Sequence, residues 1–174
     1  QPTPTPTPGP SAGMRGRVKV QNGTLVTDIG TRLRGIGASF DYGGTVSATN
    51  GAIGSALTQT YGLNTVHIYA ENRDQSLDAG DPGHQSRFAE VKKAVAEAEK
   101  NGFYVIIVPG GGANNGTYDL NWLRTFWSIY ATEFKNHSEV IFEVMNEPAS
   151  GCQDNHPSSA LDMEAELYKH IRAI

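Results

Sequence analysis

The chain has 174 residues and a formal net charge of −4, from 14 basic and 18 acidic residues. No basic cluster stands out, which argues against nucleic acid and against an anionic membrane surface as partners. No apolar run approaches the roughly 20 residues that a membrane-spanning helix needs. Cys152 is the only cysteine, so no disulfide can form within the chain.

The N-terminal segment is expected to be a spacer. Its first ten residues, QPTPTPTPGP, hold five of the nine prolines. Alternating proline and threonine favours neither helix nor sheet, because proline lacks a backbone N–H. We expect residues 1–13 to form an extended linker of polyproline II type and residues 14–174 to form one folded domain. Such a linker suggests a secreted, extracellular protein with a further module upstream.

The folded domain is expected to open with a β-hairpin. Residues 17–20 (RVKV) and 24–27 (TLVT) flank the dipeptide Asn22-Gly23. Asn-Gly between β-prone runs is the strongest short-range hairpin signal. Residues 32–39 (RLRGIGAS) then form the predicted first core strand.

Strands and helices alternate over the rest of the chain. Further strands are predicted at 64–70, 103–109 and 139–145, and helices near 50–60, 85–100, 119–135 and from about 159. This alternation predicts an α/β fold with right-handed βαβ crossovers, and the nearly unbroken apolar strands are typical of a parallel sheet. Four βα units are about half of a (β/α)8 TIM barrel, which takes about 250 residues. We therefore expect the N-terminal half of a TIM barrel, with a small open doubly wound sheet as the alternative.

A doubly wound sheet would usually carry a phosphate- or dinucleotide-binding fingerprint. After the first strand, Phe40 stands where that fingerprint needs its third glycine. The glycine-rich loop at 110–116 runs directly into Thr117, without the lysine that a phosphate-cradling loop places before its hydroxyl. A nucleotide-binding domain is therefore the weaker alternative.

Candidate site residues lie where the predicted strands end, because function gathers at the C-terminal ends of parallel strands. Asp41 and Tyr42 follow the first strand and could line a substrate site, although Asp41 could equally begin a turn. In the second strand, alternation places His67, Tyr69 and Glu71 on one face. His67 and Tyr69 are further candidates for substrate binding. No second histidine lies at metal-ligand spacing, so neither a metal site nor a cofactor is expected.

The fourth strand carries the strongest signal. Residues 139–148 read EVIFEVMNEP, a buried strand that ends in an amide, a carboxylate and a proline. Glu143 and Glu147 share strand parity, and the deeper Glu143 is expected to be structural, with Arg34 as its partner. Glu147 lies at the rim, where substrate and water can reach it. Pro148 ends the strand because it has no N–H to donate.

Residues 125–148, TFWSIYATEFKNHSEVIFEVMNEP, resemble glycoside hydrolase family 5 and its relatives in the cellulase superfamily. The opening hairpin, LRGIG at 33–37 and NTV at 64–66 fit the same family, so the resemblance covers about residues 14–174. It implies a retaining glycoside hydrolase that acts on a β-linked polysaccharide such as cellulose, mannan or a related β-glucan.

The resemblance also implies roles for individual residues. Glu147 would be the general acid/base, and Asn146 would hydrogen-bond the 2-hydroxyl of the sugar. The family's nucleophile is a glutamate at the end of the seventh strand, beyond the four strands expected here, so this chain is expected to lack it. The alternative function is that of a non-catalytic half-barrel that binds carbohydrate or associates with itself.

Overall fold

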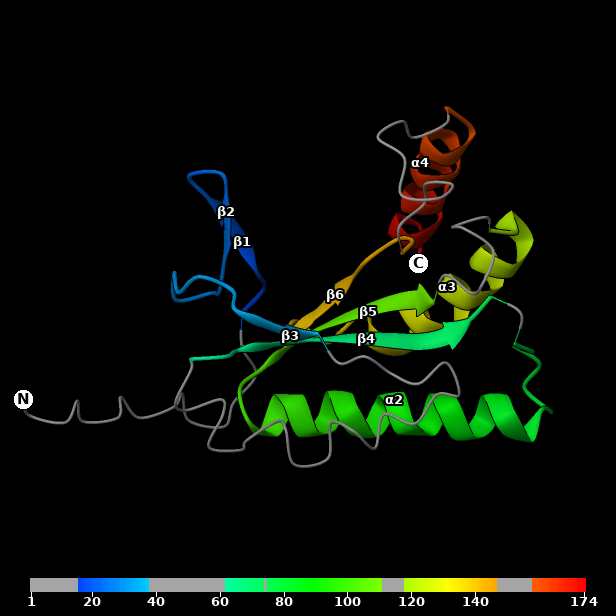
Figure 1. The fold of residues 1–174 in the computed structure, drawn as a ribbon, viewed down its shortest axis with the longest axis horizontal. Helices are drawn as coiled ribbons and strands as arrows, with labels where there is room; N and C mark the ends of the chain where they lie inside the picture. Colours follow the sequence, from blue (N-terminus) through cyan, green and yellow to red (C-terminus); the bar gives the residue numbers. More distant parts are fainter. Residues whose placement is uncertain (1–15, 38–61, 74, 111–117, 147–157) are drawn as a thin grey trace, which may run out of the picture.

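The computed structural model describes residues 16–37, 62–73, 75–110, 118–146 and 158–174. In this part of the chain a small hairpin precedes a parallel sheet, and long helices connect and follow the strands (Figure 1). None of the described helices is both long and apolar enough to cross a lipid bilayer. The spacer and the helix predicted near 50–60 lie outside the described residues.

The predicted hairpin is confirmed. Strands β1 (Lys19–Gln21) and β2 (Thr24–Val26) pair in antiparallel register. Asn22 and Gly23 form the two-residue turn, with φ values of 51° and 72°. Positive φ at both central positions gives a turn whose twist matches that of the strands, which is why Asn-Gly predicts it so well.

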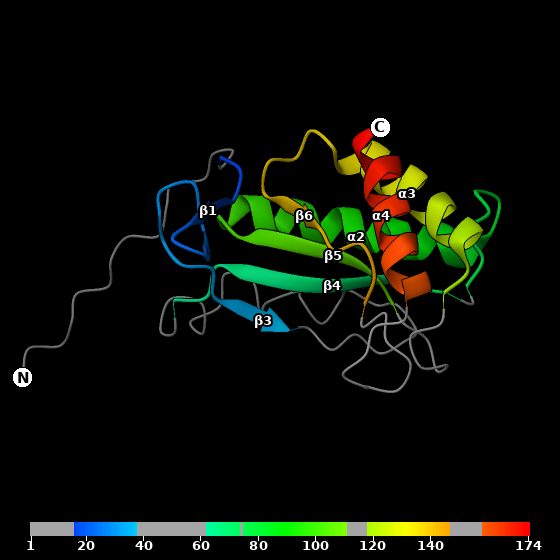
Figure 2. The same cartoon turned by 90° about the horizontal axis from the view of Figure 1, so that it is seen from above.

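The parallel sheet is also confirmed, and its four strands run in the order β3-β4-β5-β6 (Figure 2). Their bounds are β3 Gly35–Gly37, β4 Thr65–Asn72, β5 Tyr104–Gly110 and β6 Val140–Phe142. Neighbours in sequence are neighbours in the sheet, as in a barrel wound in one direction. Strand β6 is shorter than the predicted 139–145, because side chains bind the backbone groups of Val144 and Asn146 after it.

Among the described residues, one helix connects β4 to β5, a second connects β5 to β6, and a third follows β6. They are α2 (Pro82–Lys100), α3 (Leu120–Phe134) and α4 (Ser158–Arg172). Helix α2 begins earlier than the apolar periodicity predicts because Asp81 caps it, accepting a hydrogen bond of 2.8 Å from the backbone N–H of His84. Asp119 caps α3 in the same way, through the N–H of Trp122.

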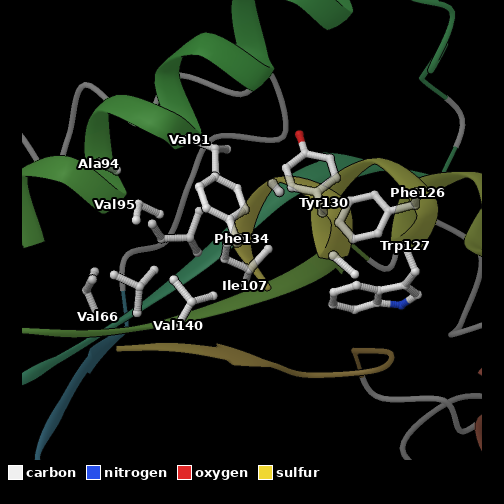
Figure 3. Packing of buried hydrophobic residues seen from close by; sticks show 14 of the residues in the cluster. Val66, Val91, Ala94, Val95, Ile107, Phe126, Trp127, Tyr130, Phe134 and Val140 are labelled. Carbon is white, nitrogen blue, oxygen red and sulfur yellow. The ribbon is translucent and has the colours of Figure 1, made fainter. Parts of the chain in front are cut away.

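The hydrophobic core lies between one face of the sheet and helices α2 and α3 (Figure 3). Alternate residues of the strands supply the sheet side, and the apolar stripes of the helices supply the other. Its largest members include Ile68, Ile107, Val91, Val95, Leu123, Phe126, Trp127 and Tyr130. The residues between them on β4, His67 and Tyr69, belong to the opposite face, where the candidate site lies.

Candidate functional site

The side chains of His67 on β4 and Glu143 just after β6 meet on the face of the sheet opposite the core. Nε2 of His67 lies 2.8 Å from Oε2 of Glu143. The two side chains are 22% and 38% exposed, so the pair is partly shielded yet open to solvent. An imidazole and a carboxylate in this arrangement can bind polar groups of a ligand.

The expectation that Glu143 needs a partner is confirmed, but the observed partner is His67 and not Arg34. Arg34 precedes β3, at the N-terminal end of the sheet, whereas Glu143 follows β6 at the C-terminal end. Strands β4 and β5 also separate β3 from β6. The alternation of side chains along the strand placed Glu143 on the correct face of the sheet. It could not show that Glu143 and Arg34 lie at opposite ends of the strands.

Tyr69 extends this site toward the residue that precedes the candidate acid. Its hydroxyl donates to Oδ1 of Asn146 across 3.0 Å. Its ring meets that of His67 edge to face, with centroids 4.9 Å apart. Because Oδ1 is the acceptor for Tyr69, the other end of the Asn146 amide is a hydrogen-bond donor group.

Tyr118 holds the backbone of the same residue. The Tyr118 hydroxyl donates to the carbonyl oxygen of Asn146 at 2.8 Å, and the N–H of Asn146 lies 3.1 Å from the same hydroxyl. Burial raises the pKa of Tyr118 above its ordinary value, despite the opposing effect of the bond to Asn146, so the hydroxyl keeps its proton. Asn146 is thus held through its side chain and through both of its backbone groups.

These contacts explain why β6 is short. The N–H of Glu143 still bonds to the carbonyl of Ile107 at 3.0 Å, as in a strand. The carbonyl of Val144 instead accepts from Nε1 of Trp127, on α3, at 3.0 Å. Side chains therefore replace a neighbouring strand as partners of Val144 and Asn146, and nothing in the strand pattern of the sequence indicated this.

Glu71 does not join His67 and Tyr69, contrary to the prediction from alternation. The register of β4 against β5 shifts between Tyr69 and Asn72, so the alternation breaks before Glu71. The side chain of Glu71 is fully buried among groups of helices α2 and α3. Its carboxylate accepts hydrogen bonds from Nδ1 of His84, Nε of Arg87 (2.7 Å) and the hydroxyl of Tyr130 (3.0 Å).

Three residues of the predicted site, Asp41, Tyr42 and Glu147, lie outside the described residues. The structure brings together the other three, His67, Tyr69 and Asn146, and adds Glu143 and Tyr118 to them. Among the described residues at this site, one imidazole and one carboxylate are too few ligands for a structural metal ion.

The cellulase family model (glycosyl hydrolase family 5) matches residues 27–174. No curated protein matches the chain. Among solved structures, a cellulase shares 19% identity at a TM-score of 0.65, over 95% of this chain and 53% of its own. A β-glucanase from Saccharophagus degradans shares 19% identity at a TM-score of 0.62, over 99% of this chain and 55% of its own. The catalytic domain of an endoglucanase from Thermobifida fusca shares 20% identity at a TM-score of 0.58, over 88% of this chain and 50% of its own.

The chain therefore spans about half the length of these solved structures. At such identities the likeness shows the fold. The four parallel strands with their helices correspond to part of a TIM barrel, as the sequence predicted.

Proposed function

Since the chain belongs to glycosyl hydrolase family 5, we propose that it carries the acid/base portion of a retaining glycoside hydrolase that acts on β-glucan. The observation that supports this most directly is the way in which Asn146 is held. Tyr69 and Tyr118 bond to its side chain and backbone. A residue of an irregular segment whose side-chain oxygen and two backbone groups are all bound is suited to place its neighbour, Glu147, with the accuracy that proton transfer requires.

In the proposed reaction, Glu147 gives its proton to the glycosidic oxygen while a second carboxylate attacks the anomeric carbon and the glycosidic bond breaks. Glu147 then takes a proton from water as that water displaces the enzyme carboxylate from the sugar. The second carboxylate belongs to a strand beyond the part of the barrel seen here. Asn146 donates from its amide nitrogen to the 2-hydroxyl of the sugar, a contact that strengthens in the transition state.

We further propose cellulose or a related β-glucan as the substrate, with mannan as the other candidate. The Saccharophagus degradans β-glucanase, one of the structures of similar fold, was solved in complex with cellotetraose. The partly exposed pair of His67 and Glu143 offers hydrogen-bonding groups to sugar hydroxyls. A polymeric substrate also supports the proposal that the enzyme is secreted.

The test is Glu147→Gln in the longest natural chain that contains this sequence. We expect turnover on soluble β-glucan to fall by about 10²- to 10⁴-fold, the usual contribution of a general acid/base. Glu133→Gln is the matched control, because Glu133 lies exposed on α3 and away from the site. A loss of only a few-fold for Glu147→Gln would remove this residue as the acid.

A second measurement separates the two chemical steps. In Glu147→Ala, an aryl cellobioside with a good leaving group needs no acid to react, so added azide should restore turnover by replacing the activated water. The glycosyl azide product should keep the β configuration if the enzyme is retaining. If the longest natural chain that contains this sequence binds cellotetraose and releases no product from any β-glucan or mannan, the protein is a carbohydrate-binding protein instead.

A further inference from the structure

Glu99, His137 and Glu139 form a second cluster of ionisable side chains, near the N-terminal end of β6 and so at the opposite end of the strands from the candidate site. Glu99 comes from the last turn of α2, His137 from the connection after α3, and Glu139 directly precedes β6. Nδ1 of His137 lies 2.9 Å from Oε1 of Glu99 and 3.1 Å from Oε1 of Glu139. One ligand atom of each residue lies within 4.8 Å of the other two.

Glu139 provides an independent indication that this cluster binds a ligand. The residue is only 1% exposed. Its second carboxylate oxygen, Oε2, is buried and has no hydrogen-bond partner in the described part of the chain. A buried carboxylate oxygen without a partner is costly, and buried charges in proteins are normally paired or bound to a metal ion.

The surroundings increase this cost. Glu99 and Glu139 place two carboxyl groups beside one imidazole, near the C-terminal end of helix α2, which carries partial negative charge. Either a shared proton or a bound cation would relieve the repulsion between the two carboxyl groups.

We propose that Glu99, His137 and Glu139 form a binding site for a divalent metal ion of the zinc type. One imidazole nitrogen with two carboxylate oxygens suits Zn²⁺, whereas Ca²⁺ takes six to eight oxygen ligands and Mg²⁺ keeps much of its water. Ligands at 2.0–2.1 Å from a tetrahedral zinc ion are about 3.3 Å apart. The distances of 2.9 Å and 3.1 Å around Nδ1 of His137 are close to that value, so these two pairs of ligand atoms need little movement.

The site is also accessible and firmly supported. The side chains of His137 and Glu99 are 33% and 34% exposed, which lets an ion enter and leaves a position for water. The carbonyl of Glu139 accepts from the N–H of Val105 at 3.0 Å, so this ligand is anchored in the sheet. A bound ion would tie the end of α2 to the start of β6 and to β5. Its role would be structural, because Glu139 lies four residues before Glu143, about 13 Å along an extended strand.

The test is calorimetric titration of the metal-free purified protein with Zn²⁺, and with Ca²⁺ and Mg²⁺ as comparison ions. We expect one zinc site that weakens at least tenfold in Glu139→Gln and in His137→Gln. His170→Gln and Glu133→Gln are matched controls, since both residues lie elsewhere, on α4 and α3, and should bind zinc as the wild type does. Zinc at 100 times the wild-type Kd should raise the Tm by about 5–10 °C in the wild type and in both controls, and by less in Glu139→Gln and His137→Gln.

Several results would overturn the proposal. These are an unchanged zinc affinity in Glu139→Gln, no binding at millimolar zinc, or equal affinity for Ca²⁺. Greater stability of Glu139→Gln in chelator, with no effect of zinc on the wild type, would show that the two carboxyl groups share a proton instead. If a variant does not fold, Co²⁺ added to the wild type serves as the probe: intense visible absorption from a four-coordinate ion supports the site, and the weak spectrum of hydrated Co²⁺ contradicts it.

Discussion

Nε2 of His67 and Oε2 of Glu143 lie 2.8 Å apart although β5 separates their strands. Neighbouring strands are about 4.8 Å apart, so the backbones of β4 and β6 are about 10 Å from one another. Two side chains can meet across that distance when they converge over the strand between them. The contact therefore fits a sheet that curves toward this face, as the wall of a barrel does around its interior.

A double-mutant cycle on this pair measures its strength. We expect His67→Gln and Glu143→Gln each to lower the free energy of unfolding, and their coupling to be about 0.5–1 kcal/mol because both groups are partly exposed. Urea denaturation of the four proteins gives the value. The pair Lys92–Glu133, 3.9 Å apart on the surface, is the control and should show coupling near zero. Equal coupling in both cycles would mean that the shielded position of His67 and Glu143 adds nothing.

Tyr118→Phe tests how Asn146 is positioned. The change removes the hydroxyl that bonds to both backbone groups of Asn146 and keeps the ring. If Glu147 is the acid, a small displacement of this segment should lower the kcat of the longest natural chain that contains this sequence by about 10- to 100-fold, with little change in KM. Tyr168→Phe, at an exposed position on α4, is the control. Unchanged kcat on β-glucan would show that the Tyr118 hydroxyl does not position the acid.

Glu71→Gln tests the buried network between β4 and helices α2 and α3. The substitution keeps the shape of the side chain but leaves Arg87 and His84 without their carboxylate. Removal of one partner from a buried ion pair costs roughly 3 kcal/mol of unfolding free energy. Chemical denaturation measures this loss, with the exposed Glu133→Gln as the reference. A loss below about 1 kcal/mol would show that water replaces the missing charge.

The stability of the chain at alkaline pH depends on Tyr130. Burial, and then the charge of Glu71, raise the pKa of Tyr130 well above its ordinary value. The unfolded chain releases this proton near pH 10, while the folded chain retains it. The contribution to stability is therefore complete below pH 10 and is lost as the pH rises above it. Tyr130→Phe should show a flatter decline in urea midpoint between pH 9 and pH 11, and identical slopes for both proteins would contradict the assignment.

Local features of the fold were predictable where one short stretch carries the whole signal. Asn22-Gly23 predicted a turn that the structure forms with positive φ at both residues. The apolar stripe of α2 and the run FYVIIVP predicted a helix and a buried strand within three residues of their observed bounds. Each of these patterns depends on backbone preference and burial within a few turns of chain, which the sequence itself contains.

The site was predictable only in part. His67, Tyr69 and Asn146 were named from their positions at strand ends, and the structure joins Tyr69 to Asn146 directly. The partner of Glu143 was predicted wrongly, and Glu71 was placed on the wrong face. A shift in strand register, as at Glu71, depends on the packing of two strands against each other and leaves no mark in the alternation of one of them.

The sequence by itself determined the alternating βα order, the hairpin, the half-barrel class and the strand ends at which polar residues gather, because these follow from periodicity and turn chemistry along the chain. Only the tertiary structure decided that His67 faces Glu143, that Tyr118 and Trp127 end β6, and that Glu99 lies beside His137 and Glu139. Those relationships join residues from separate elements. Their distances are set by how helices pack on a twisted sheet, which no single stretch of sequence specifies.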